Sequence, residues 1–366
     1  MASISIILPT ARDNYSIIGL PNIHIFQPTI NSLKNQSFKD FELIIIDALY
    51  HLRPKLFQGE PFREDKLPFR VKHIPIEHND RFNHRFWMDN RRWNVCGTLN
   101  TGIIHAEGKL LVRIDDCSEF ESGYIKKFWE GYQSGYWPMA MHIKYLEGKP
   151  AYLNHEYRKK GYESSTSVNY GCKNSFEHNK DDILRKVYGE GGLIRDTRYD
   201  TVKKEGGKKI GPHEWYYGYS SVPLKAALKV NGYDELFDAD KSLEDTDMGS
   251  RLEMAGFKDK FLLDINHQVV EHEHLPIAEN LVNKDIKPIK CNYAIYLNNR
   301  KRNRWKANSS TLSEKDIKHI RKESLKSPCS PTSNFYDNNC KGRMFDMWVK
   351  NQPLFDLKEE RKYYND

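Results

Sequence analysis

Three uninterrupted runs of β-forming apolar residues constrain the fold of this chain most. The runs occupy residues 4–8, 41–46 and 110–114, and helix-like patterns at 26–36 and 93–106 lie between them. A strand that is apolar on both sides of its pleat has to be covered on both faces, as in a parallel sheet between helices. The sequence therefore predicts an α/β fold with a mostly parallel central sheet flanked by helices.

The size and composition of the chain agree with a fold of that kind. Its 366 residues, 39% hydrophobic and 12% aromatic, can bury a core large enough to offset chain entropy. The 6 cysteines are scattered without a CxxC pair, which favours reduced thiols in a cytoplasmic protein. The first apolar run is far shorter than the ~18 residues of a spanning helix and has no basic leader, so neither a membrane anchor nor a secretion signal is expected there.

The rest of the chain is less regular and suggests a division into three parts. Residues 189–211 are rich in Gly, Lys and Arg with little apolar periodicity, which predicts a mobile loop over the site. Further helices are expected at 243–255, 278–304 and 313–325, and further strands at 260–265 and 269–274. We divide the chain into a first half at 1–117, a second half at 118–274 and a basic helical C-terminal extension at 275–366.

The formal charge of +7 lies almost entirely in the extension, where 19 Lys and Arg face 11 Asp and Glu. Such a charge excess suits a peripheral contact with an anionic membrane or a protein, or simply a solvated surface, so it does not identify a partner. A nucleic-acid-binding protein that uses the basic run 300–304 is the non-enzymatic alternative. We expect no nucleic acid, because no recognised nucleic-acid module accompanies the charge.

Carboxylates follow two of the predicted strands. Asp47 ends the second run, and Asp115 and Asp116 follow the third. In open α/β sheets, ligands bind beyond the carboxyl ends of the strands, where Asp47 could accept a hydrogen bond from a nucleobase. Two adjacent carboxylates suit Mg²⁺ or Mn²⁺, which bridge protein oxygens to substrate phosphate. The alternative is that one of them caps a helix beginning near Ser118.

Two further groups of polar residues could carry chemistry. His272 and His274 are two apart, so on a strand they share a face, where they either ligate a metal or have a structural role. Glu244 and Asp245 begin a helix whose dipole favours acids, and one of them could instead be a general base. The aromatic cluster at 215–219 either stacks on a sugar ring or fills the core.

Five segments, in this order and with these separations, resemble the family 2 glycosyltransferases of the GT-A fold over about residues 3 to 274. The segments are ISIILPT at 4–10, SLKNQSFKDFELIIID at 32–47, LNTGIIHAEGK at 99–109, NGYDELF at 231–237 and EDTDMGSRL at 244–252. In the family, the acidic triplet often ends in a third Asp. This chain departs from that pattern, with Cys117 at the third position. That difference leaves open whether Asp115 or Asp116 is the direct metal ligand.

The resemblance implies a role for each matching residue. It places Asp245 as the general base and Asp116 as the ligand of a Mn²⁺ or Mg²⁺ ion on the diphosphate, with His272 completing the metal or phosphate contacts. Asp115 would meet the ribose or the metal. The other expected nucleotide contacts are Pro9, Thr10, Asp47 and Asn100, and the expected acceptor contacts are Glu244, Trp215 and Tyr217.

The activity that follows from the resemblance is inverting transfer of a sugar from a nucleoside-diphosphate sugar to a hydroxyl of a glycan or another acceptor. UDP is the favoured nucleotide, with GDP and dTDP as alternatives. A metal-dependent hydrolase of a phosphorylated substrate, using Asp115, Asp116, His272 and His274, is the competing enzyme class. A nicotinamide dehydrogenase is disfavoured because no GxGxxG follows the first strand.

Overall fold

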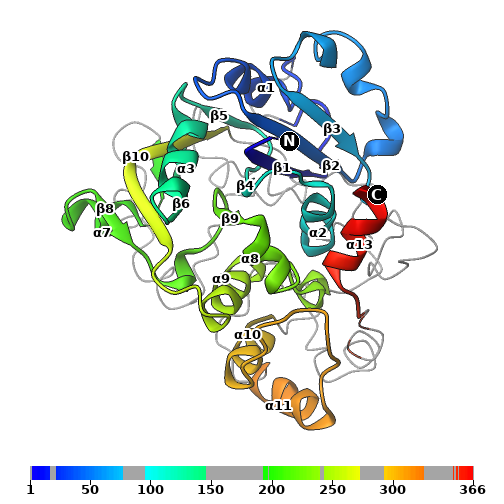
Figure 1. Ribbon diagram of the computed structural model, residues 1–366, viewed down its shortest axis with the longest axis vertical. Coiled ribbons are helices and arrows are strands. Elements are labelled where there is room, and N and C mark those ends of the chain that lie inside the picture. The colour runs from blue at the N-terminus through cyan, green and yellow to red at the C-terminus, as the bar shows by residue number, and fades with distance from the viewer. Residues whose placement is uncertain are drawn as a thin grey trace, which may run out of the picture.

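The protein has the α/β architecture that its sequence predicts (Figure 1). The computed structural model describes residues 2–16, 22–76, 95–145, 193–196, 198–239, 243–272, 292–324, 349, 352 and 354–365. Within this part of the chain, no helix is both long enough and apolar enough to cross a membrane.

The first sheet has five strands in the order β3-β2-β1-β4-β9. Four of them run parallel, namely β1 (Ile4–Thr10), β2 (Phe41–Asp47), β3 (Arg70–Ile74) and β4 (Leu110–Arg113), and β9 (Ser221–Pro223) is an antiparallel edge strand. All seven residues of β1 and of β2 are buried, as uninterrupted apolar runs predict. The register pairs Thr10 with Asp47, so these two expected donor contacts end neighbouring strands.

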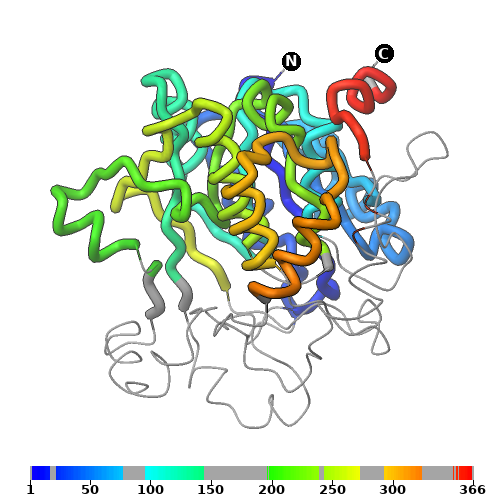
Figure 2. The backbone as a smooth tube through the Cα atoms, turned by 90° about the horizontal axis from the view of Figure 1, so that it is seen from below, coloured from blue at the N-terminus to red at the C-terminus, as the bar shows by residue number. Residues whose placement is uncertain are grey.

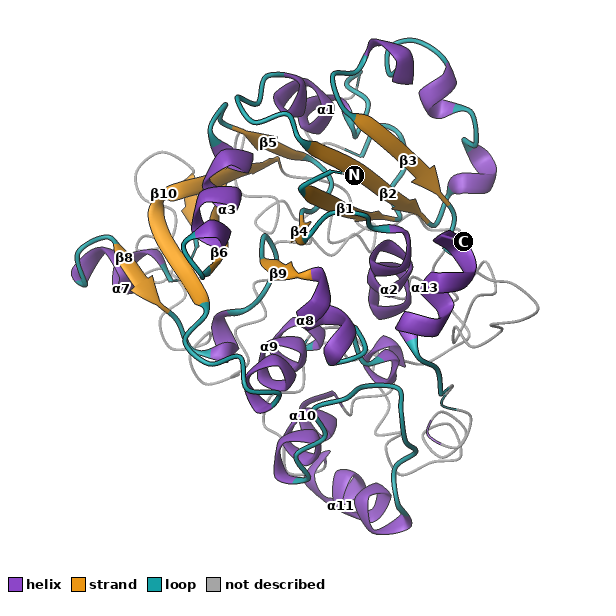
Figure 3. Cartoon of the chain, viewed as in Figure 1, coloured by secondary structure: helices purple, strands orange, loops and turns teal. Residues whose placement is uncertain are grey.

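Side chains of β1 alternate between two hydrophobic clusters, which explains why the run has no polar face. Ile4, Ile6 and Leu8 pack with α1 (Gln27–Lys34) and α3 (Tyr124–Gln133). Ile7 packs in the opposite cluster, which contains α2 (Val95–His105), α8 (Leu224–Lys229) and α9 (Glu244–Met254). Figure 3 shows α1 and α2 on opposite sides of the sheet.

A second sheet is built around β10 (Phe261–His272), which pairs with β5 (Ser118–Phe120), β6 (Trp137–Tyr145) and β8 (Lys208–Ile210). The strand β7 (Leu193–Arg195) extends this sheet beside β6. The expectation of two strands at 260–265 and 269–274 was wrong in one respect, because β10 is continuous through the polar residues between them. Its pairing with β6 shifts register between Leu263 and Gln268, and such an irregularity hides the strand's alternation.

The prediction of a mobile loop at 189–211 was also wrong for the residues described there. This segment contains β7, the helix α7 (Tyr199–Lys204) and β8. Gly206 and Gly207, both at φ +90°, form the tight turn between α7 and β8, a conformation that glycine adopts without strain. Val202 is the buried residue of α7, and no residue of β8 is buried, so the sequence of these two elements carries little apolar periodicity.

The described helices of the C-terminal extension pack back onto the preceding sequence (Figure 2). Helix α10 (Asn292–Lys301) contacts α9 and α11 (Glu314–Ser324), and α13 (Leu357–Asn365) lies against α2. Arg361 of α13 donates to the carbonyl oxygens of Ile103 (3.2 Å) and Ile104 (2.7 Å), near the end of α2. The helix expected at 278–304 begins at Asn292 in the described chain, and 278–291 lie outside it.

The basic run at 300–304 is tied to the fold. Arg302 donates to Asp316 at 2.5 Å, and Arg304 donates to the carbonyl oxygen of Ser310 at 3.0 Å. Arg300 contacts the hydroxyl of Tyr296 at 3.1 Å. Arg300, Arg302 and Arg304 thus each have a contact within the protein, while residues 300–303 lie at the surface.

Candidate functional site

The end of β4 and the first turn of α9 meet around one guanidinium. Arg113 forms an ion pair through Nη1 with Asp245, and its Nη2 lies 3.7 Å from Oδ1 of Asp115. The side chains of Arg113 and Asp245 are each 12% exposed, whereas that of Asp115 is 34% exposed. Asp115, expected on the donor side, and Asp245, expected on the acceptor side, therefore share one partly open site.

Asp245 is held at both carboxylate oxygens. Oδ1 receives Arg113, and Oδ2 receives the backbone N–H of Gly218 at 3.3 Å. Burial raises the pKa of Asp245 above its ordinary value, and Arg113 and the Gly218 N–H partly offset that rise. Glu244 beside it is partly buried, and burial together with the charge of Asp245 raises the pKa of Glu244 to about 7.

The first turn of α9 is placed by close packing. Leu243, just before the helix, has φ +71°, a left-handed conformation that few non-glycine residues adopt. A Cβ at Gly249 would lie 2.5 Å from the carbonyl oxygen of His213, in the short helix η6 (His213–Trp215). The close approach that Gly249 permits thus brings the aromatic segment at 215–219 beside the start of α9.

Asp116 is enclosed, unlike its neighbour Asp115. Its side chain is 0% exposed, and it accepts from the hydroxyl of Thr10 at 2.7 Å and from Nη1 of Arg12. The interpretation of this pair as a helix cap was wrong, because Ser118 begins β5 and α3 starts only at Tyr124. Thr10 therefore reaches the expected donor site through its contact with Asp116.

The backbone of His272 lies beside the acidic turn, but its imidazole has a different partner. The His272 N–H donates to the carbonyl oxygen of Cys117 at 2.9 Å, while Nε2 lies 3.0 Å from Oε2 of Glu119. His274 lies outside the described residues. Asp116 and His272, the expected metal ligands, thus contact Arg12 and Glu119 respectively.

The described residues contain no group of three or more His, Cys, Asp or Glu side chains arranged to hold a metal ion. Hydrated Mg²⁺ and Mn²⁺ need only one or two protein carboxylates, with water and substrate phosphate supplying the remaining oxygens. Asp115 fits that requirement because its carboxylate is partly exposed, whereas Asp116 would first have to leave Arg12.

Asp47, expected to contact a nucleobase, is saturated by neighbouring side chains. Arg53 donates to both of its oxygens at 2.6 and 2.9 Å, and Nε2 of His73 lies at 2.8 Å. Burial opposes the charge of Asp47, but its hydrogen bonds to His73 and Arg53 outweigh that effect and lower its pKa. Asp47 therefore fixes the orientation of Arg53 and His73.

Asn100 has an internal role in the structure. It is 0% exposed, and its side-chain amide bonds the N–H and carbonyl oxygen of Tyr233 at 2.8 and 2.9 Å and a carboxylate oxygen of Glu235 at 3.0 Å. These contacts hold the segment 231–237 against α2. Pro9 lies within the buried strand β1, paired with Ile46.

The aromatic cluster is divided between core and site. Tyr216 and Tyr219 are buried, as the core interpretation predicts. Tyr217 is partly exposed, its ring lies 3.9 Å from the guanidinium carbon of Arg198, and its hydroxyl donates to Asp196 at 3.1 Å. Tyr217 directly precedes Gly218, whose N–H donates to Asp245, but its own side chain contacts Arg198 and Asp196. Trp215 is also partly exposed and packs against the hydrophobic cluster that contains Leu263.

Sequence reasoning missed Arg113, Arg12 and Gly218. Arg113 carried a signal that could have found it, since it is the one charged residue in the run 110–114 and shares a strand face with Asp115. Arg12 and the N–H of Gly218 lie in irregular segments, where no periodicity indicates direction.

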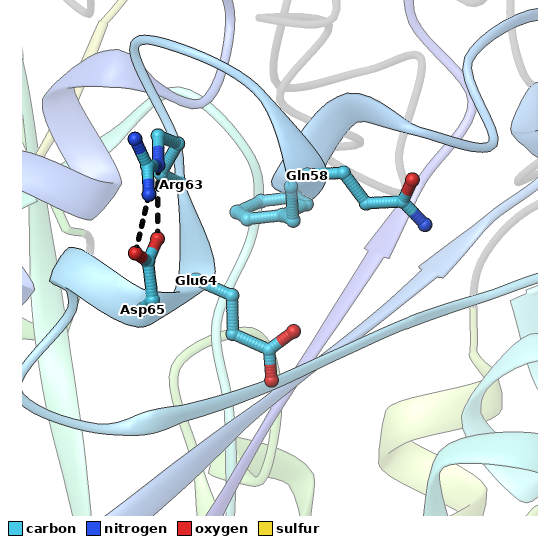
Figure 4. Close-up of a pocket in the computed structure, with 5 residues that line it drawn as sticks. Gln58, Arg63, Glu64 and Asp65 are labelled. Atoms are coloured by element: carbon cyan, nitrogen blue, oxygen red, sulfur yellow. Dashed lines mark hydrogen bonds and ion pairs between the residues drawn. The ribbon is translucent and has the colours of Figure 1, made fainter.

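A shallow pocket of about 530 Å³ lies elsewhere, in the connection between β2 and β3 (Figure 4). It is lined by Phe57, Gln58, Arg63, Glu64 and Asp65, and Arg63 pairs with Asp65 across its rim. None of these residues is an expected site residue, and the rim is well exposed, so we assign the pocket no role.

Comparison with known proteins found one similar curated protein and a set of weakly similar structures, and no family model matches the chain. The curated protein is the GalNAc(5)-diNAcBac-PP-undecaprenol beta-1,3-glucosyltransferase of Campylobacter jejuni, 24% identical over 237 residues, or 64% of this chain. The match spans 61% of that protein's length.

The solved structures include S. aureus TarS residues 1–349, alone and in complex with UDP-GlcNAc. The first has a TM-score of 0.43 and the second 0.42, both at 11% identity. Each match covers 88% of this chain, with 70% and 71% of the other chain. A likeness at these TM-scores does not establish a shared fold.

Proposed function

We propose that this protein is an inverting glycosyltransferase that moves a sugar from a nucleoside-diphosphate sugar, with UDP favoured, to an acceptor hydroxyl. The observation that carries the proposal is the joint contact of Asp115 and Asp245 with Arg113 at the carboxyl end of β4. Ligands of open α/β sheets bind at such strand ends. The reaction needs there both a carboxylate that binds the donor or its metal ion and a base for the acceptor.

Asp245 is the general base of the proposed reaction. It accepts the proton of the acceptor hydroxyl, whose oxygen forms a bond to the anomeric carbon while the bond from that carbon to the diphosphate breaks. Attack from the face opposite the leaving group inverts the configuration. The raised pKa of Asp245 suits this role, because a base whose pKa approaches the working pH accepts a proton more readily.

The donor nucleotide would lie over the ends of β1, β2 and β4. Arg53, held by Asp47, would lie below the nucleobase, and Asp115 offers its partly exposed carboxylate to the ribose or to a divalent ion. A bound Mn²⁺ or Mg²⁺ would stabilise the charge of the departing nucleoside diphosphate. The residues that would hold it are Asp115, and Asp116 once it is released from Arg12.

The curated relative favours a particular pairing of sugar and acceptor. Its name describes glucosyl transfer to a glycan carried on diphospho-undecaprenol. By analogy, we propose a hexosyl donor and a glycan or glycoconjugate acceptor for this chain. Tyr217 precedes Gly218 in the chain, is partly exposed and has Arg198 over its ring, so an acceptor sugar would have to stack on the other face of that ring.

The proposal is tested with a panel of UDP-, GDP- and dTDP-sugars. We expect a UDP-sugar to raise the melting temperature of the protein and, with a suitable glycan acceptor, to be converted into UDP and a glycosylated product. A hydrolase would instead release product from its phosphorylated substrate at the same rate with and without the acceptor. Failure of every nucleotide sugar to bind or to react would contradict the proposed function.

A further inference from the structure

Arg113 joins the end of β4 to the candidate base. It stands in the last position of β4, where its backbone N–H donates to the carbonyl oxygen of Ser220 at 2.9 Å. That bond fixes the end of β4 against the segment that also carries Gly218. Both donors to Asp245, the Arg113 guanidinium and the Gly218 N–H, therefore come from adjoining backbone on one sheet edge.

The contacts of Arg113 differ from those of a structural arginine. Arg251, which is 0% exposed, donates to Asp247 at 2.6 Å and to the carbonyl oxygen of Gly232 at 2.6 Å, all within the interior. Arg113 instead contacts two carboxylates of the candidate site, one of them a third exposed, and within the described part of the chain its guanidinium donates to no backbone carbonyl oxygen. Its Nε is buried without a hydrogen-bond partner.

We propose that Arg113 is a positioning residue, which holds the carboxylate of Asp245 at a fixed distance from the donor aspartate Asp115 so that the base faces the acceptor hydroxyl. This inference rests on the proposed function. Catalysis by a positioned group depends steeply on geometry, and a planar guanidinium on a strand end fixes direction as well as charge. Asp245 stands at the start of a helix behind a left-handed residue, and among the described residues Arg113 is its one side-chain donor.

The position of Arg113 predicts which part of the proposed reaction its loss affects, the acceptor step or donor binding. Because Arg113 lies between Asp115 and Asp245, its loss should disturb the acceptor step while the nucleotide contacts made by β1 and β2 remain. An arginine needed only for folding would affect stability and leave the turnover of the folded fraction unchanged. The split between kcat and KM therefore separates the two roles.

The first experiment measures whether Arg113 and Asp245 interact, whatever the activity of the protein. Urea unfolding is compared for the wild type, Arg113→Gln, Asp245→Asn and the double variant. We expect the effects of the single variants on the unfolding equilibrium constant to be non-additive by at least ~5-fold, as for contacting residues. Additive effects would overturn the proposal.

The second experiment measures UDP release from a UDP-sugar with its acceptor. We expect Arg113→Gln to lower kcat at least ~30-fold with donor KM within about 3-fold of the wild type, and Arg113→Lys to recover part of the loss, because it restores charge without the planar fork. Arg251→Lys is the matched control, with a lower melting temperature but an unchanged kcat.

The outcomes separate the proposed function from the positioning role of Arg113. A wild-type protein that turns over no nucleotide sugar contradicts the proposed function, and the unfolding cycle alone then decides the Arg113–Asp245 contact. A wild-type protein that is active, with Arg113→Gln equally active, overturns the positioning role and leaves the proposed function standing. A loss in Arg113→Gln that appears only as raised donor KM would likewise overturn it.

Discussion

Arg113 and Asp245 form an ion pair that joins the last residue of β4 to the first turn of α9. These residues are 132 positions apart in the sequence. Their contact brings the end of the parallel sheet to the helix that carries the candidate base. The site thus depends on how α9 packs, as well as on the strands that deliver the donor carboxylates.

Glu244 makes the stability of the protein depend on pH. Its pKa is raised to about 7 by burial and by Asp245, so the native state favours the protonated form. Stability is then fully present below the ordinary pKa of about 4.3 and declines as pH rises toward about 7. We expect Glu244→Gln to raise stability relative to the wild type by on the order of 1 kcal/mol at pH 8 and by much less at pH 4. Urea unfolding at both pH values measures the difference in stability between the variant and the wild type. An equal difference at both pH values would contradict the raised pKa of Glu244.

Asp115 should be the carboxylate that links a divalent ion to the donor. Its side chain is partly exposed, whereas Asp116 is enclosed by Thr10 and Arg12. We expect Mn²⁺ to strengthen UDP binding, and Asp115→Asn to reduce that effect at least ~10-fold, because the ion loses its protein oxygen. Calorimetry of UDP with and without Mn²⁺ measures the difference. If Asp116→Asn removes the effect and Asp115→Asn does not, the assignment of ligands is reversed.

Asn231 should be important for attaching the C-terminal segment. Its amide donates to the carbonyl oxygens of Ala307 and Phe355 and accepts the N–H of Leu357, each at 2.8 Å, and its φ is +60°. Alanine there leaves buried polar groups unpaired, so we expect a loss of about 3 kcal/mol in the free energy of unfolding.

The matched control for Asn231 is Asn303, an exposed residue with φ +52°. Asn303→Ala incurs only the conformational penalty of a left-handed residue, about 1 kcal/mol. Similar losses in the two variants, measured by urea unfolding, would show that the hydrogen bonds of Asn231 contribute little.

Much of the fold was predictable because it follows from local apolar patterns. The runs at 4–8, 41–46 and 110–114 all became parallel strands, since nothing but coverage on both faces can bury them. The helix expected at 243–255 is α9, within one residue at each end. The segment with β7, α7 and β8 was missed because its elements are too short to show a period.

The candidate site was predictable only in part, for a different reason. Strand ends indicated Asp47 and Asp115, and the structure places both at the expected sheet edge. The sequence does not reveal which partner a carboxylate takes, so the binding of Arg53 by Asp47, of Arg12 by Asp116 and of Glu119 by His272 could not be foreseen. Those pairings depend on contacts between residues distant in the chain.

The most direct test of the account is the rate of UDP release by the wild type and by Asp245→Asn, with a UDP-sugar and its acceptor. We predict that both proteins bind UDP with the same stabilisation against heat, and that the variant releases UDP at least ~10²-fold more slowly because it lacks the base. A variant that works at the wild-type rate would contradict the assignment of Asp245, and a wild type that releases no UDP from any UDP-sugar would contradict the favoured donor.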